Sequence, residues 1–71
     1  MDLDKFFTSN PRAIKDTFEE VNSKYSIVKF DNGDWDDDVW AMIDVNFFNG
    51  HIFGVKTTKQ AAIDFINDWD K

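Results

Sequence analysis

The chain has 71 residues, a net charge of −6 from 14 acidic and 8 basic residues, 17% aromatic residues and no cysteine. This length fits one domain, residues 1–71, and the aromatic content predicts a folded core rather than a disordered chain. The lack of cysteine excludes disulfides and thiolate metal sites, and the acidic balance disfavours direct contact with nucleic acid or an anionic membrane.

The N-terminal segment is short and apolar. It predicts one helical turn that is capped by Asp2 and stops within residues 8–11. Its apolar residues are Leu3, Phe6 and Phe7, and we expect them to cover the core. No basic region or long apolar run precedes or follows them, so no signal peptide or membrane span is expected and the predicted location is cytoplasmic.

A longer helix is predicted from Asn10. Asn10 followed by Pro11 matches an N-cap with proline in the first helical position. Ile14, Phe18 and Val21 then recur at steps of four and three, which is the spacing of one helical face. We therefore expect an amphipathic helix of about three to four turns.

Three strands are predicted next, the third of them after the loop at residues 48–50. Residues 26–30 and 39–47 are rich in β-branched and aromatic side chains, and residues 39–47 alternate between apolar and polar. A three-residue loop, 48–50, with Gly50 in the left-handed conformation would place Val45 opposite Phe53 and Ile43 opposite Val55.

Thr57 and Gln60 match a capping box, which predicts a C-terminal helix. The apolar stripe of that helix is Ala62, Phe65, Ile66 and Trp69. The predicted fold is thus a two-layer α+β domain with an N-terminal helix, a three-stranded antiparallel meander and a C-terminal helix, both helices covering one face.

The sheet face away from the helices would carry four apolar side chains. They are Ile27, Trp40, Met42 and Ile52. An exposed face of this kind would form a homodimer interface in a structural or scaffold module, unless the N-terminal segment wraps around and buries it.

Catalysis is not expected. His51 is the single histidine, there is no cysteine, and no glycine-rich phosphate loop is present. We therefore predict a protein that is not an enzyme and needs no cofactor, with His51 an ordinary residue beside a turn.

The segment between the first two predicted strands concentrates the negative charge. Acidic and basic residues balance in residues 1–30 and again in residues 45–71, whereas residues 31–44 hold six aspartates and no lysine or arginine. The predicted partner-binding residues are Asp31, Asp34, Trp35, Asp36, Asp37, Asp38, Trp40 and Asp44. Folding alone gives no reason to gather like charges, because their repulsion destabilises the compact state.

Two other interpretations of this segment remain open. Clustered carboxylates could bind a divalent cation weakly, although the calcium-loop pattern fails: Met42 stands at position twelve counted from Asp31, and Val39 replaces the glycine counted from Asp34. Alternatively, the acids are a solvated loop and Trp35 folds back onto the sheet.

The predicted function is that of a small acidic inhibitor. Carboxylates spaced along a loop stand in for phosphates, and an indole stacks on a guanidinium or fills a pocket. The expected partner is a basic nucleic-acid-binding enzyme or complex. The chain would act on it as a nucleic-acid mimic, in the manner of a phage anti-defence protein. A nuclease immunity protein or an antitoxin is the alternative setting.

Overall fold

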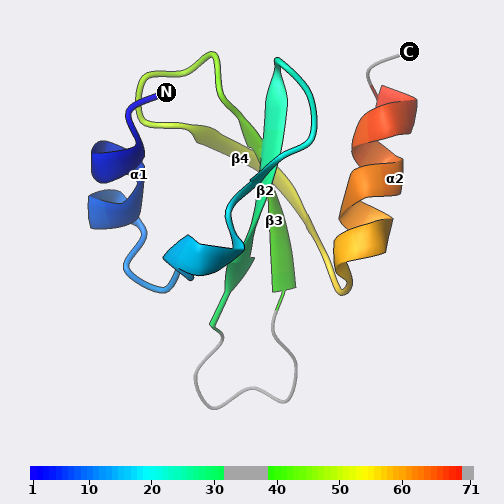
Figure 1. The fold of residues 1–71 in the computed structure, drawn as a ribbon, viewed down its shortest axis with the longest axis horizontal. Coiled ribbons are helices and arrows are strands. Elements are labelled where there is room, and N and C mark those ends of the chain that lie inside the picture. Colours follow the sequence, from blue (N-terminus) through cyan, green and yellow to red (C-terminus); the bar gives the residue numbers. More distant parts are fainter. Residues whose placement is uncertain (32–38, 70–71) are drawn as a thin grey trace.

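The computed structural model describes residues 1–31 and 39–69 (Figure 1). In chain order they form α1 (Leu3–Ser9), the 3-10 helix η1 (Lys15–Thr17), β1 (Glu19–Glu20), β2 (Tyr25–Phe30), β3 (Val39–Asp44), β4 (His51–Lys56) and α2 (Lys59–Trp69). The strands pair antiparallel in the order β1-β2-β3-β4. The predicted α+β meander with a helix before and after it is confirmed, but the sheet has four strands instead of three.

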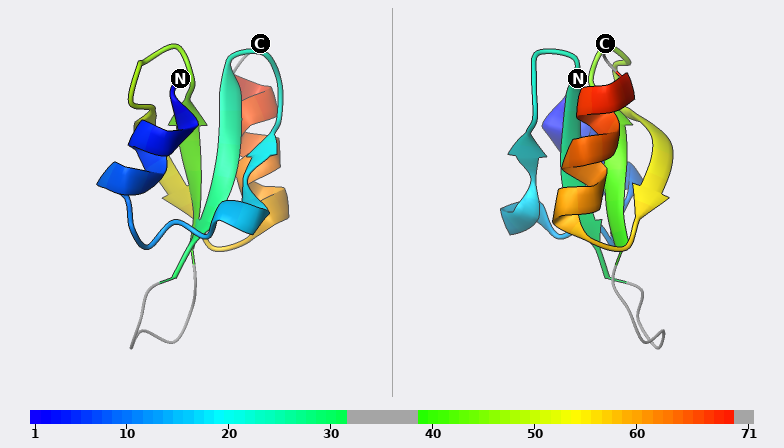
Figure 2. Two further views of the ribbon diagram at one scale, coloured as in Figure 1. Left: turned by 60° about the vertical axis from the view of Figure 1, so that its left-hand side comes forward. Right: turned by 90° about the vertical axis from the view of Figure 1, so that its right-hand side faces the viewer.

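The two helices cover opposite faces of the sheet (Figures 1 and 2). One buried cluster lies on the α1 side and consists of Phe6, Val28, Ala41 and Ile43. The other lies on the α2 side and consists of Ile27, Met42, Ala62 and Ile66. The prediction that both helices share one face is wrong. Successive residues of β2 and β3 are apolar, so both faces of the sheet carry apolar side chains, and each face needs a helix to bury them.

Helix α1 is closed at both ends by its own polar side chains. The Asp2 carboxylate accepts a hydrogen bond from Lys5 N (3.2 Å), as predicted for the cap. At the other end the backbone N (3.0 Å) and side-chain Nδ2 (2.9 Å) of Asn10 both donate to Phe6 O. Asn10 therefore ends α1 and does not begin a second helix.

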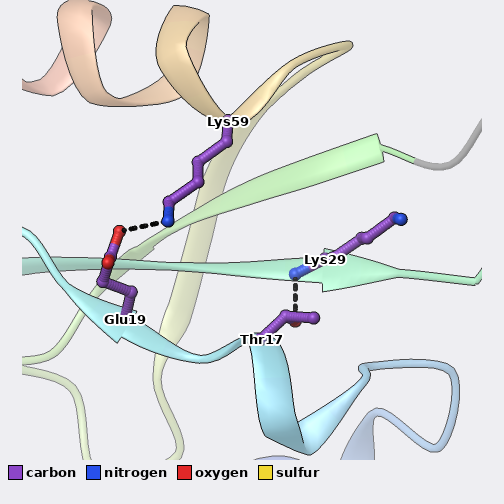
Figure 3. A network of polar contacts seen from close by, with 4 residues as sticks. All are labelled: Thr17, Glu19, Lys29 and Lys59. Carbon is purple, nitrogen blue, oxygen red and sulfur yellow. Dashed lines mark hydrogen bonds and ion pairs between the residues drawn. The ribbon is translucent and has the colours of Figure 1, made fainter.

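The segment predicted as the main helix runs alongside β2 instead. Ile14 N donates to Lys29 O (2.8 Å), and Lys29 N donates to the Thr17 hydroxyl (2.9 Å; Figure 3). Phe18 then packs on the α1-side cluster, whereas Val21 packs on the α2-side cluster. Residues three apart share a face on a helix but point to opposite faces on a strand. The backbone groups on the outer edge of β2 favour the extended form, because it pairs with them.

The β3–β4 hairpin differs from the predicted register. Ile43 pairs with Ile52 rather than with Val55, and the register shifts by one residue between Met42 and Ile43. This β-bulge turns Phe53 onto the α2 side and Ile52 onto the α1 side, each opposite to the predicted face. The left-handed Gly50 is confirmed, with φ +72°.

Helix α2 carries the predicted apolar stripe. Ala62 and Ile66 are fully buried, and Trp69 at the last turn is 59% exposed. The helix begins one residue later than the capping box suggests, because the hydroxyl of Thr58, not Thr57, accepts from Ala61 N (3.1 Å). Within residues 1–31 and 39–69, neither length nor hydropathy would let any helix cross a lipid bilayer.

Candidate partner-binding surfaces

The predicted acidic site falls on the connection between β2 and β3. Phe30 pairs with Val39, so the stem of this hairpin ends just before residues 31–38. Asp34, Trp35, Asp36, Asp37 and Asp38 lie outside the described residues. The structure therefore places three of the eight predicted site residues, namely Asp31, Trp40 and Asp44.

The base of the hairpin is held by hydrogen bonds to the segment before η1. Asp31 is exposed, and its backbone N donates to Arg12 O (2.9 Å). Ala13 forms a bridge to Phe30 on the same edge. These contacts fix the direction in which the chain leaves β2.

Trp40 is partly buried against the α2-side cluster. Its cross-strand neighbours are Lys29 on β2 and Lys56 on β4, and the Lys59 ammonium lies 6.0 Å from the centroid of its ring. Lys59 also forms an ion pair with Glu19 of β1 (3.2 Å; Figure 3). Trp40 is thus partly buried near three lysines at the end of β3 that adjoins the connection to β2, and it does not project from the domain.

Asp44 lies at the opposite end of β3. It pairs with Tyr25 of β2 and His51 of β4, and its carboxylate accepts from Asn46 N (3.0 Å). Five residue steps separate it from Val39, which corresponds to about 17 Å along the strand. The structure therefore does not bring Asp44 together with Asp31.

The apolar face predicted for a homodimer is not exposed. Ile27 and Met42 are 0% and 1% exposed beneath α2. Ile52 packs on the other cluster, beside Phe6, so the four residues do not even share a face. This prediction is wrong because α2 covers the face that was expected to be open.

Four aromatic rings form a continuous cluster at the Asp44 end of the α2 side. Tyr25 meets Phe53 edge-on (5.3 Å between centroids), and the Trp69 indole stacks on both Phe53 (5.9 Å, 24°) and Phe65 (5.8 Å, 18°). The spacing of Phe65 and Trp69 on one helical face was visible in the sequence. The contribution of Phe53 was not, because it depends on the bulge in β4.

A second apolar surface lies at the loop that joins β3 and β4. Phe47 and Phe48 are 54% and 67% exposed, and Leu3 of α1 is 44% exposed. Asp2 N donates to Phe48 O (2.7 Å), which ties α1 to this loop. A hollow of about 200 Å³ beside Leu3 is lined in part by Phe18 and Glu20.

The described residues contain no group of three or more His, Asp or Glu side chains arranged to hold a metal ion. His51 is exposed, and its ring lies 5.1 Å from the ring of Phe47.

Comparison with protein-family models, with curated proteins and with solved structures found no match for this chain.

Proposed function

We propose that this chain is a small protein-binding domain that captures a basic partner with the acidic hairpin at residues 31–38. By doing so it occupies the surface with which that partner binds nucleic acid. The observation that carries the proposal is the placement of charge: the whole excess of −6 falls in residues 31–44, and the flanking segments are neutral. A local negative field of this kind steers a cationic partner and speeds its association.

The fold around the hairpin supports this role. Both faces of the sheet are covered by helices, and the two buried clusters are built from described residues of α1, α2 and the strands. The stem is fixed by the Phe30 and Val39 pair and by the hydrogen bond from Asp31 N to Arg12 O. A rigid stem lowers the entropy cost of presenting a binding loop to a partner.

Phage anti-defence proteins, nuclease immunity proteins and antitoxins are three settings for the same chemistry. In each of them the partner is a basic enzyme or complex that acts on nucleic acid. The homodimeric scaffold is not proposed further, because Ile27 and Met42 are buried within the chain.

The test neutralises the hairpin without changing side-chain size. The variant is Asp36→Asn/Asp37→Asn/Asp38→Asn. Its matched control removes three charges from exposed positions elsewhere: Asp4→Asn, Asp16→Asn and Glu20→Gln. Each protein is immobilised, loaded with a lysate of the source cell and eluted with a salt gradient. We expect nucleic-acid-binding proteins to elute at high salt from the wild type and the control, and at low salt from the hairpin variant.

A functional readout completes the experiment. The main retained protein is purified, and its binding to a fluorescently labelled duplex is measured by polarisation with increasing wild-type chain. The proposal is supported if the wild-type chain abolishes duplex binding by the retained protein and the hairpin variant does not. Unchanged duplex binding at saturating chain, or equal retention of both variants, contradicts it.

A further inference from the structure

The aromatic cluster of α2 and β4 leaves more than half of Trp69 exposed to solvent. Trp69 stacks on Phe53 and Phe65, yet 59% of the residue remains exposed. The cluster already holds a cation of the chain itself, because the Lys56 ammonium lies 4.6 Å from the centroid of the Phe65 ring. Indole attracts a cation more strongly than a phenyl ring does.

The exposed area is suited to a single side chain and not to an apolar interface. An aromatic residue offers about 150–250 Å² when it is buried, so the exposed part of Trp69 amounts to roughly 100–150 Å². A stable protein interface needs about 800 Å² on each partner. A cation stacked on the ring needs only the face of the indole. Asp44, directly opposite Tyr25 of the same cluster, favours a positively charged group.

We infer that the exposed part of the Trp69 indole is a second contact site for the basic partner and takes an arginine side chain of that partner. The guanidinium is planar and weakly hydrated, so it stacks on an indole with less loss of hydration than an ammonium. This inference rests on the proposed function for the existence of a basic partner, but it concerns a different surface, at the opposite end of β2 from the acidic hairpin.

The test uses a defined probe in place of the partner: a nine-residue peptide of alternating arginine and glycine. The same peptide with citrulline, which is neutral, and with lysine serve as comparisons. Binding is followed by NMR through the indole Nε1–H signal of Trp69, assigned with the Trp69→Phe variant. This readout separates Trp69 from Trp35 and Trp40, which a fluorescence titration does not.

Three variants are compared with the wild type. Trp69→Ala removes the ring, and Trp69→Phe keeps an aromatic face. Phe48→Ala is the matched control, because Phe48 is 67% exposed but lies outside the cluster. We expect the arginine peptide to shift the Trp69 indole signal and to bind Trp69→Ala about three- to tenfold more weakly, with Trp69→Phe between and Phe48→Ala unchanged. The lysine peptide binds more weakly than the arginine peptide, and the citrulline peptide leaves the signal in place.

The hairpin variant separates this inference from the proposed function. If neutralising Asp36, Asp37 and Asp38 abolishes peptide binding while Trp69→Ala has no effect, the Trp69 site is refuted and the acidic hairpin stands. If Trp69→Ala weakens binding while the hairpin variant does not, the Trp69 site stands and the hairpin proposal fails. An unmoved indole signal with saturating arginine peptide also overturns the inference, whatever the folding of the alanine variant.

Discussion

Shortening Ile27 to valine measures whether the sheet is packed on both faces. Ile27 is 0% exposed and lies in the cluster beneath α2 with Met42 and Ile66. Removing one methylene from such a core costs about 0.5–1.5 kcal/mol, whereas the same change on an open sheet face stays within about 0.5 kcal/mol. A chain of this length has a total stability of about 4–11 kcal/mol, so the variant remains folded.

The assay is urea unfolding followed by circular dichroism. With a slope of about 1 kcal/mol per molar urea, the loss lowers the unfolding midpoint by about 0.5–1.5 M. Val55→Ala is the exposed control, because Val55 is 54% exposed on β4, and we expect its midpoint to move by less than about 0.5 M. An unchanged midpoint for Ile27→Val would refute the covered face.

Combining variants shows which helix covers Ile27. Ile27→Val and Ile66→Val change the same cluster, so their effects on the free energy of unfolding are expected not to add. Ile27→Val and Phe6→Leu change clusters on opposite faces, so their effects are expected to add within about 0.5 kcal/mol. Stronger coupling of Ile27 to Phe6 than to Ile66 would contradict the arrangement of the helices.

Two further predictions concern local geometry. Thr58→Ala removes the cap of α2 and is expected to cost about 1 kcal/mol in urea unfolding, while Thr57→Ala, its neighbour without that bond, costs less than about 0.5 kcal/mol; equal losses would contradict the assignment of the cap. Gly50→Ala is expected to cost about 2–4 kcal/mol, because its φ of +72° disfavours a side chain and the added Cβ would meet Met1 Sδ. Gly50→Asn, which tolerates the left-handed conformation better, loses less stability if backbone strain contributes; a harmless Gly50→Ala would show that the loop relaxes.

Local signals in the sequence were sufficient for the elements that depend on nearby residues. The Asp2 cap, the left-handed Gly50 and the Ala62 and Ile66 stripe each arise within a few residues of chain, and each is found in the structure. The alternation in residues 39–47 predicted the central strand for the same reason, although the strand ends at Asp44 and not at Phe47.

The larger failures come from contacts between distant parts of the chain. Phe18 and Val21 fit a helical spacing, but the edge of β2 offers hydrogen bonds to the segment around Ile14, and the extended form satisfies them. The bulge at Phe53 is equally invisible locally, since it is set by which buried cluster the side chains of Ile52 and Phe53 must reach. Because the face covered by α2 was predicted to be open, the dimer surface predicted on that face was wrong as well.

The candidate site was predictable in part. Charge patterning along the chain located the acidic hairpin, because a run of aspartates without lysine needs no structure to be seen. The lysines around Trp40 come from two other strands and a helix, so only the sheet register reveals them. The aromatic cluster likewise joins β2, β4 and α2.

The separation of the two proposed contacts sets a lower limit on the size of the partner. The hairpin stem ends at Phe30 and the aromatic cluster begins at Tyr25, about 17 Å away along β2. An interface of standard size, about 800 Å² per partner, is roughly 30 Å across and therefore spans both. A basic peptide of four residues spans at most about 14 Å and reaches one contact at a time, whereas a folded basic domain engages both at once. The same chain should therefore bind a folded nucleic-acid-binding domain more tightly than a four-residue basic peptide, because the second contact forms without a second loss of translational freedom.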